Sequence, residues 1–302
     1  MTRYGKVAVL YGGESSEREV SLKGGSAVLA ALTAQGIDAH GIDAGADLVE
    51  RLMGGRYDRA FIVLHGHLGE DGCVQGLLEV LGIPYTGSQV GASAVAMDKV
   101  LSKAVWRAAS IPTPDYRIIE SEAQLDAALE LGFPLIIKPV SEGSSIGISK
   151  VKAEGELKAA YKKARSFGPV IAERCIVGPE YTCAILGKQA LPIIRLETPH
   201  DFYDYEAKYL LDSTRYHCPS GLSPQAEREL QDIAQAAFAA LGARGWGRVD
   251  IMVDGQGRPY VLELNTVPGM TDHSLVPMAA QAAGLPFEVL VERILAQTLE
   301  GS

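Results

Sequence analysis

Residues 260–270 have the sequence YVLELNTVPGM, which predicts an apolar strand that runs into a Pro-Gly turn. Because successive side chains of a strand point to opposite faces, Glu263 and Asn265 are expected on one face. Leu262 and Leu264 are expected together on the other face. Two polar side chains on one face of an apolar strand indicate a binding site, and its ligand has to be inferred from other parts of the chain.

A second strand lies just upstream, in GRVDIMVDGQGRP (residues 247–259), and its Asp-Gly dipeptide indicates the turn of a hairpin. Pairing Asp254 with Pro259 across this turn gives two further cross-strand pairs: Asp250 opposite Glu263, and Arg248 opposite Asn265. Facing carboxylates about 5 Å apart destabilise a sheet. At 4 Å their repulsion is roughly 4 kcal/mol for an effective dielectric near 20.

A divalent cation between Asp250 and Glu263 would remove this repulsion. Mg²⁺ suits the position because it takes few protein oxygens and completes its shell with phosphates and water. Asn265 would add a neutral oxygen ligand on the same face. The alternative is a solvated hairpin without a metal, since the register is inferred from the turn alone.

The composition limits the classes of function. The 302 residues are 47% hydrophobic and 22% charged, which is ordinary for a globular protein of two or three domains. A net charge of −9 without a Lys/Arg stripe argues against nucleic acid or an anionic membrane as the main partner. The short apolar run before Tyr11 is too short for a signal peptide or a membrane span, so no membrane insertion is expected.

The four cysteines have no metal-binding or redox spacing, which favours a reduced, cytoplasmic compartment. They are Cys73, Cys175, Cys183 and Cys218.

The first third of the chain alternates strands with helices, which predicts a parallel sheet with covering helices. KVAVLYGG leads into a helix from about Val20 to Gln35, and RAFIVLHG leads into a helix over residues 74–81. The proline-rich SIPTPDY (110–116) is expected to be a linker. The chain continues with further strands, a polar loop over 199–222 and an Ala-rich helix that ends near Gly242.

A lysine inside the strand PLIIKPV, Lys138, indicates an anionic partner, because burial of an unpaired ammonium is costly. SEGSSIGIS (141–149) follows directly, and its backbone and the hydroxyls of Ser144 and Ser145 are suited to wrap a phosphate. The alternative is a lysine that reaches solvent at the strand end. The chain has no Walker or G-x-G-x-x-G motif.

The segment AERCIVGPE (172–180) is expected to hold the rest of a nucleotide. Backbone amides between Glu173 and Val177 would bind the purine, and Glu180 would bind the ribose. The alternative is an edge strand with solvated acids.

The chain resembles the ATP-grasp superfamily in the order of four features: the lysine, the Gly/Ser loop, this segment and the carboxylate hairpin. Within it the chain resembles the D-alanine–D-alanine ligases over essentially its whole length. The most specific pieces are YGGESSEREVS (11–21), HGHLGEDGCVQG (65–76), IKPVSEGSSIGISKV, FYDYEAKY (202–209), GWGRVDIMV and LELNTVPGMTDHSLVP. The chain departs from the family at His67 and Leu68, where Gly or Arg is common, which leaves the shape of that loop open.

The resemblance implies an α/β protein of ATP-grasp architecture. An N-terminal parallel α/β domain (1–96) would precede two α+β domains (97–178 and 179–302) that sandwich the nucleotide, the last one carrying the metal site and a lid loop. It also implies a cytoplasmic homodimer.

The resemblance further implies an ATP-dependent ligase for peptidoglycan precursor synthesis. One D-alanine carboxylate would be phosphorylated by ATP, and the amine of a second D-alanine would displace the phosphate. Mg²⁺ would be bound by Asp250, Glu263 and Asn265, and Mn²⁺ can substitute. The ATP-binding residues would be Lys99, Lys138, Ser144, Ser145, Glu173, Arg174, Cys175, Ile176, Val177, Glu180 and Lys208.

For the amino-acid substrates, the resemblance implies binding by Glu14, His65, Lys208, Ser274 and Leu275. Catalysis would involve Glu14, Ser144, Tyr209, Arg248, Gly269 and Ser274. Each residue also has a structural interpretation. Glu14 can serve the first turn of the following helix, His65 can be a structural histidine, and the segment around Tyr209 can be a solvated loop.

Three other functions compete with D-alanine ligation. The second substrate could be D-lactate or D-serine, or the chain could be another ATP-grasp carboxylate–amine ligase. The pair Lys208-Tyr209 favours D-alanine, because depsipeptide-forming members differ in this loop. A noncatalytic nucleotide-binding protein is disfavoured, because all three metal ligands, both lysines and Arg248 are present.

Overall fold

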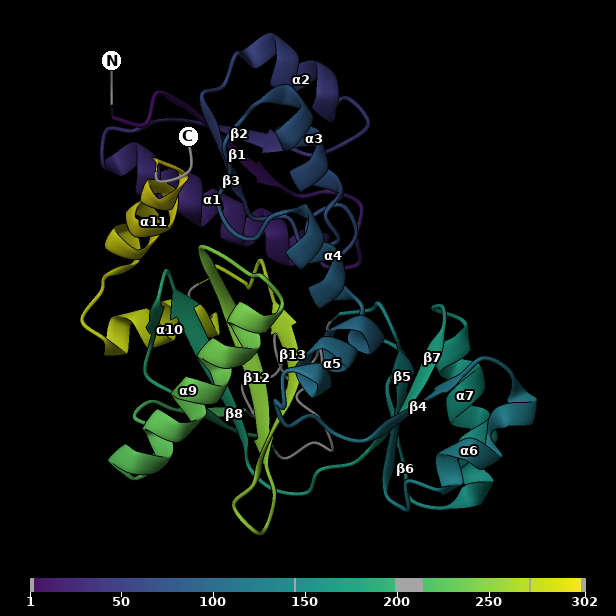
Figure 1. The fold of residues 1–302 in the computed structure, drawn as a ribbon. Coiled ribbons are helices and arrows are strands. Elements are labelled where there is room, and N and C mark those ends of the chain that lie inside the picture. Colours follow the sequence, from purple (N-terminus) through teal and green to yellow (C-terminus); the bar gives the residue numbers. More distant parts are fainter. Residues whose placement is uncertain (1–2, 144, 199–213, 272, 300–302) are drawn as a thin grey trace.

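The computed structural model describes residues 3–143, 145–198, 214–271 and 273–299. Its N-terminal part is a parallel sheet of order β2-β1-β3, as the alternating pattern predicted. The strands are β1 (Lys6–Tyr11), β2 (Asp38–Asp43) and β3 (Arg59–Ile62), and the helices are α1 (Arg18–Ala34), α2 (Leu48–Gly55), α3 (Cys73–Leu81) and α4 (Val90–Met97). Figure 1 shows this part at the top of the molecule.

The middle of the chain forms an antiparallel sheet of order β4-β7-β5-β6, at the right of Figure 1. Its strands are β4 (Tyr116–Ile119), β5 (Leu135–Pro139), β6 (Ser149–Val151) and β7 (Val170–Arg174). Helices α6 (Asp126–Leu129) and α7 (Leu157–Arg165) cover one face, with short 3-10 turns at Glu122–Gln124 and Glu154–Glu156. Ala128, Leu157 and Ala164 are buried against the strand residues Leu135 and Ile137 there.

A second antiparallel sheet has the order β11-β10-β8-β12-β13, with β9 paired to β8. The strands are β8 (Glu180–Leu186), β9 (Gln189–Ala190), β10 (Ile194–Glu197), β11 (Arg215–His217), β12 (Trp246–Val253) and β13 (Pro259–Asn265). Helix α9 (Pro224–Ala240) packs on it. The helix starts where Ser223 accepts the N–H of Ala226, with Pro224 at its first position, and both are favourable starts.

The hairpin of β12 and β13 has the predicted register where the polar residues lie. Asp250 pairs with Glu263 and Arg248 pairs with Asn265. Beyond Asp250 the register shifts at a β-bulge, so Val253 rather than Asp254 pairs with Pro259. The prediction was therefore correct on one side of the bulge and off by one residue on the other.

The bulge also corrects the predicted faces of β13. Leu262 and Leu264 were expected on one face, but Val261 and Leu264 are the residues buried against α9. Leu262 faces the opposite side, next to Glu263, and lines a cavity. A bulge leaves one residue without a cross-strand partner and interrupts the strict alternation of side chains.

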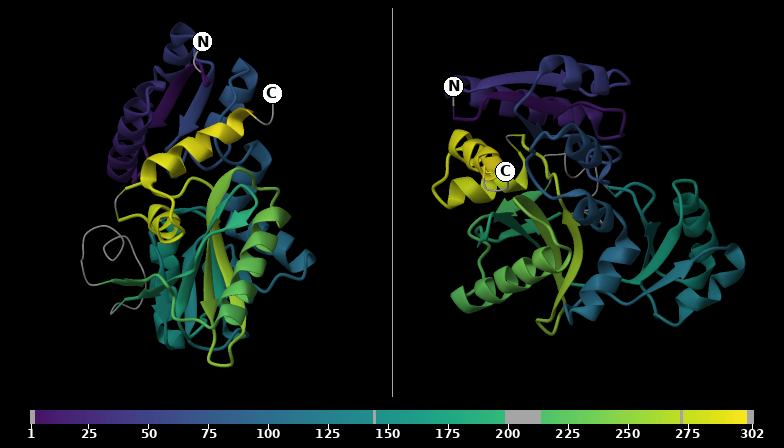
Figure 2. Two further views of the ribbon diagram at one scale, coloured as in Figure 1. Left: turned by 90° about the vertical axis from the view of Figure 1, so that its left-hand side faces the viewer. Right: turned by 45° about the horizontal axis from the view of Figure 1, so that its top comes forward.

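Two helices connect parts that are distant in sequence. Helix α5 (Lys99–Ala108) packs on α9, where Trp106 Nε1 donates to the carbonyl of Ala237 at 3.0 Å. After α10 (Leu275–Ala282), helix α11 (Phe287–Ala296) returns to the N-terminal part and packs on α1 (Figure 2). The chain ends its described part in a 3-10 turn, Gln297–Leu299.

Among the described residues, no single helix is long and apolar enough to span a membrane. One pair of consecutive segments, Leu275–Ala282 and Phe287–Leu299, is long and apolar enough when the two are taken together. The chain bends by 104° between them. Leu290, Val291 and Ile294 of this pair are buried inside the protein.

Candidate active site

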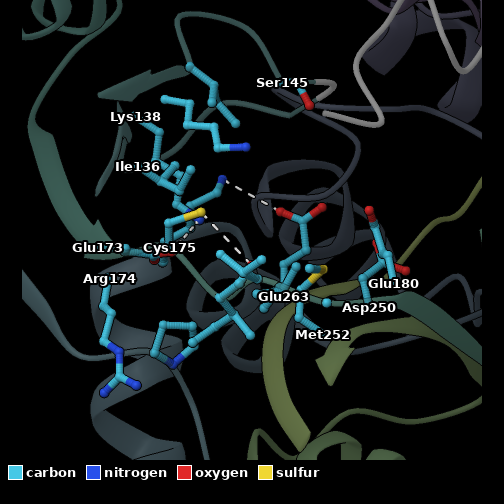
Figure 3. Close-up of a pocket in the computed structure, with 18 of the residues that line it drawn as sticks. Ile136, Lys138, Ser145, Glu173, Arg174, Cys175, Glu180, Asp250, Met252 and Glu263 are labelled. Carbon is cyan, nitrogen blue, oxygen red and sulfur yellow. Dashed lines mark hydrogen bonds and ion pairs between the residues drawn. The ribbon is translucent and has the colours of Figure 1, made fainter. Parts of the chain in front are cut away.

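A cavity of about 290 Å³ lies between the two antiparallel sheets. Lys138, Glu173 and Cys175 come from the β5–β7 side, while Glu180, Asp250 and Glu263 come from the β8–β12–β13 side. Figure 3 shows these two groups facing each other across the cavity. The predicted phosphate-binding and metal-binding elements are thus on one cavity, although they are far apart in sequence.

The two predicted phosphate-binding lysines are buried in this cavity wall. Lys99 and Lys138 are each 6% exposed, so the alternative of a solvated Lys138 is wrong. Lys138 Nζ is 2.9 Å from Glu173 Oε2. Lys99 Nζ donates to the carbonyl of Glu142 at 2.6 Å and lies 3.9 Å from Glu263. Burial lowers the pKa of Lys99, because removal from water disfavours the charged ammonium.

A third lysine, Lys103, was not identified from the sequence. It is 0% exposed, and its Nζ is 3.0 Å from Glu173 Oε1. Burial alone would raise the pKa of Glu173, but Lys103 and Lys138 outweigh this effect and lower that pKa. Glu173 is therefore a buried carboxylate held between two lysines at the cavity wall.

The segment expected to hold a purine has only part of its backbone available. The N–H of Arg174 donates to Asp115 and that of Cys175 donates to Pro134, at 2.8 and 3.1 Å. Neither of these two N–H groups is therefore available for the predicted purine contacts of this segment. Leu262 and Met252 line the cavity as well, and sequence analysis had not assigned either to the site.

The three predicted metal ligands are close together, but cations of the protein already balance the carboxylates. Arg248 binds Asp250 with two hydrogen bonds of 2.9 and 2.8 Å, and Asn265 Nδ2 donates to Asp250 at 3.1 Å. Lys99 lies near Glu263, as described above. Arg248 and Lys99 therefore lower the repulsion between these carboxylates.

A second group of polar residues lies at the end of β3. His65 is 5% exposed, and its Nδ1 is 2.8 Å from the carbonyl oxygen of Val267. A carbonyl only accepts, so Nδ1 carries the proton. Burial lowers the pKa of His65, and the neutral ring leaves Nε2 as an acceptor. Within the described parts of the chain, this buried Nε2 has no hydrogen-bond partner.

The carboxylate that faces this region is Glu17 rather than the predicted Glu14. Glu14 is exposed in the loop after β1. A Cβ atom at Gly143, in the Gly/Ser loop, would lie 3.1 Å from Glu17 Oε2. Burial raises the pKa values of Glu142 and Glu70, and the charge of Glu17 adds to both shifts. Glu17, a residue of the β1–α1 loop, therefore faces the Gly/Ser loop.

The turn after β13 brings Gly269 against Ser274. A Cβ atom at Gly269 would be 2.8 Å from Ser274 Oγ, so a larger residue at 269 would displace this hydroxyl. Ser274 precedes α10, and its Oγ accepts the N–H of Thr271 at 2.9 Å. The side chain of Leu275 is buried in the apolar core, so only its backbone is suited to contact a substrate.

The remaining predicted residues are placed as follows. Ser145 lines the cavity, with a positive φ of 60°. Ser144, Lys208 and Tyr209 lie outside the described residues, as does most of the predicted lid loop.

Comparison with known proteins identifies the family of the chain. The family models for the C-terminus and the N-terminus of D-ala D-ala ligase match residues 105–296 and 44–88. A D-alanine–D-alanine ligase of Pseudomonas fluorescens is 57% identical over 299 residues, which cover 98% of this chain and 92% of the relative. The chain belongs to the D-alanine–D-alanine ligase family. It is therefore an ATP-dependent ligase with the ATP-grasp fold that the sequence predicted.

Solved structures of this ligase family have the same fold. The D-alanine–D-alanine ligase of Bacillus anthracis matches with a TM-score of 0.88 and 37% identity, covering 98% of both chains. The same enzyme complexed with ATP matches with a TM-score of 0.87. The VanG D-Ala:D-Ser ligase of Enterococcus faecalis matches with a TM-score of 0.84 and 31% identity, covering 98% of this chain and 100% of VanG.

Proposed function

We propose that this ligase joins two D-alanines to D-alanyl-D-alanine for peptidoglycan precursor synthesis, through an acyl phosphate made from ATP. The observation that carries the proposal is the cavity between the two sheets, where two buried lysines face two carboxylates. Phosphoryl transfer needs little covalent chemistry from side chains and depends on positioned charge. The cavity offers this charge together with an apolar part, lined by Ile176, Met252 and Leu262, for a purine.

The reaction has two covalent steps. A carboxylate oxygen of the first D-alanine attacks the γ-phosphorus of ATP, and the bond to ADP breaks. The amine of the second D-alanine, after losing a proton, then attacks the acyl carbon, and inorganic phosphate leaves with the electron pair of the C–O bond. Lys99 and Lys138 hold the phosphates, Glu180 holds the ribose, and the Gly/Ser loop with Ser144 and Ser145 covers the triphosphate.

Mg²⁺, for which Mn²⁺ can substitute, is the cation that fits the donor set of Asp250, Glu263 and Asn265. Two carboxylates and one carboxamide on adjacent strands leave most of an octahedral shell to phosphates and water, as Mg²⁺ prefers. When bound, the metal neutralises charge on the triphosphate. Arg248 would then be released from Asp250 to face the oxyanion of the tetrahedral intermediate, together with the N–H of Gly269.

For the first D-alanine, Glu17 is the acceptor of the ammonium group in place of Glu14. His65 Nε2, a buried acceptor beside it, is suited to a second hydrogen bond from the same ammonium. Ser274 and the backbone of Leu275 bind the carboxylate of the second D-alanine. Lys208 contacts the transferred phosphoryl group, and Tyr209 with Ser144 closes the site. We further propose a cytoplasmic homodimer.

The main alternative is a different second substrate, as in the D-Ala:D-Ser ligase to which the chain is 31% identical. The 57% identity to D-alanine–D-alanine ligases favours D-alanine. The test is phosphate release from ATP with D-alanine, D-serine and D-lactate, each supplied singly and in pairs with D-alanine. Faster turnover with D-serine or D-lactate than with D-alanine alone would overturn the assignment of the second substrate.

A further inference from the structure

Lys103 lies behind the wall of the nucleotide cavity, and the functions proposed above do not use it. It is one helical turn after Lys99 in α5, so both side chains point from the same face of the helix. Lys99 lines the cavity and Lys103 does not. The Lys103 side chain is fully buried and pairs with Glu173, whose side chain is 3% exposed.

The position of Lys103 is fixed from two sides. Its Nζ donates to Thr113 Oγ1 at 2.8 Å, and this hydroxyl donates in turn to the carbonyl of Val261 at 2.8 Å. Its other partner is Glu173 Oε1, while Oε2 of the same carboxylate contacts Lys138 at 2.9 Å. Helix α5, strand β7 and strand β13 therefore meet at this one ammonium.

The charges of this cluster explain how Lys103 affects the charge that Lys138 presents to a triphosphate. A buried Glu173 paired with Lys138 alone would neutralise Lys138 and hold its ammonium away from a triphosphate. With Lys103 on the other oxygen, the carboxylate is shared between two cations. This group carries three positive charges, on Lys99, Lys103 and Lys138, and two negative charges, on Glu173 and on the Glu263 beside Lys99. Its net charge is positive, and a polyphosphate can neutralise it.

We propose that Lys103 is a positioning residue for ATP binding: by occupying Glu173 Oε1, it keeps Lys138 available to the phosphates of the nucleotide. This inference rests on the proposed role of Lys138 at the triphosphate. It adds a residue that touches neither the nucleotide nor the metal ligands. Lys103 acts on nucleotide affinity through Glu173, and the amino-acid sites are not part of this connection.

The test is calorimetric titration of the full-length protein with ADP and Mg²⁺, for the wild type and for Lys103→Met. The variant keeps the length of the side chain and removes its charge. We expect the dissociation constant of ADP to rise about tenfold, the size typical of a coupled buried contact. The KM for ATP should rise in parallel, while the KM values for D-alanine change little. Unchanged ADP affinity in a folded Lys103→Met protein would overturn the proposal.

A double-mutant cycle with Glu173→Gln tests the route of the effect. If Lys103 acts through Glu173, Lys103→Met should change ADP affinity by only about twofold in the Glu173→Gln background. An equal loss in both backgrounds would show that Lys103 does not act through the carboxylate, and would refute the mechanism. Should Lys103→Met fail to fold, Thr113→Val removes the hydroxyl that accepts from Lys103 and donates to Val261. We expect a smaller loss of ADP affinity from it, and no loss would count against the proposal.

Two further variants separate this inference from the proposed function. Lys138→Met should weaken ADP binding at least as much as Lys103→Met; if it does not, the proposed phosphate site itself is wrong. If Lys138→Met weakens binding and Lys103→Met does not, only the inference fails. The matched control is Lys158→Met, a lysine on α7 that is 62% exposed and paired with Glu122. This control should leave ADP affinity unchanged.

The pH dependence of ADP affinity provides a further test, because a purely structural role of Lys103 would not change it. Burial and the charges of Lys138 and Lys99, opposed by Glu173, together lower the pKa of Lys103 to about 8. ADP affinity of the wild type should therefore fall as pH rises through this range. Lys103→Met has no such proton to lose, so its affinity should fall less between pH 7 and 9. Parallel curves for the two proteins would contradict the proposal.

Discussion

His65 and Glu70 hold the same residue, Val267, by its two backbone groups. His65 Nδ1 donates to the carbonyl oxygen of Val267 at 2.8 Å, and Glu70 Oε1 accepts its N–H at 3.2 Å. The other carboxylate oxygen of Glu70 accepts the N–H of Gly66 at 2.9 Å. The loop after β3 and the turn that carries Gly269 are therefore connected by side chains, so a shift of one would move the other.

The first prediction concerns the charge of Glu70. Burial, and then the nearby charge of Glu17, raise the pKa of Glu70 from 4.5 to about 8. A raised pKa in the folded state means that the contribution to stability is full below about pH 4.5 and is lost as pH rises towards 8. Glu70→Gln cannot titrate. We therefore expect the thermal midpoint of the wild type, relative to Glu70→Gln, to fall between pH 5 and pH 8.

This measurement needs only thermal unfolding curves across that pH range. The comparison with Glu70→Gln cancels the titration of other groups, including His65, whose lowered pKa has the opposite sign. Two midpoint curves that run parallel from pH 5 to pH 8 would show that Glu70 is ionised throughout.

The second prediction separates Glu17 from Glu14. Glu17→Gln should raise the KM for the first D-alanine by about tenfold or more, because a hydrogen bond to a charged group contributes roughly 1.5–3 kcal/mol. Glu14→Gln makes the same chemical change on an exposed side chain, and its kinetics should stay near those of the wild type. Steady-state kinetics at saturating ATP measure both. A larger effect of Glu14→Gln would restore the assignment made from sequence.

The third prediction tests the metal ligands. Glu263→Gln keeps the size of the side chain and removes a charge, so turnover should fall by about 100-fold or more through lost cation binding. Circular dichroism should show an intact fold. Raising the Mg²⁺ concentration should restore part of the activity. The same substitution at Glu197, an exposed partner of His217, should have no such effect, and near-normal phosphate release by Glu263→Gln would refute the metal site.

The fourth prediction tests the bulge in β13. Leu264 is buried against α9, so Leu264→Ala should lower the free energy of unfolding by about 2–5 kcal/mol. Leu262 lines the nucleotide cavity instead, so Leu262→Ala should weaken ADP binding by about three- to tenfold. Its effect on unfolding should be smaller than that of Leu264→Ala. Chemical denaturation and ADP titration of the two variants measure these effects, and equal losses of stability would argue against the bulge.

Much of this site could be predicted from local patterns. The Asp-Gly turn and the alternation in β12 and β13 led to the correct pairing of Asp250 with Glu263. The one-residue error at the turn is cancelled by the extra residue of the bulge, which lies between the turn and this pair. The bulge itself has no marker in the sequence, since Leu262 is a residue that suits a regular strand. The strict alternation therefore assigned Leu262 to the wrong face.

Other features depend on packing between distant segments. Lys103 follows the usual pattern of a helix surface, and only the arrival of Glu173 from β7 makes it a buried partner. Glu14 and Glu17 lie in the same short loop before α1, and the sequence does not specify which one turns towards Gly143. The glycine at 143, whose Cβ would crowd Glu17, carries this information only once the two loops are placed together.

The return of α11 to α1 has a consequence for synthesis on the ribosome. Leu290, Val291, Ile294 and Leu295 of α11 are fully buried in the same apolar cluster as Val28 and Leu32 of α1. When the first sheet leaves the exit tunnel, the face that these side chains cover is still open to water. It stays open until residues 287–296 have been translated. The first segment made by the ribosome is thus among the last to complete its packing, and in the meantime the nascent chain exposes an apolar surface that chaperones can bind.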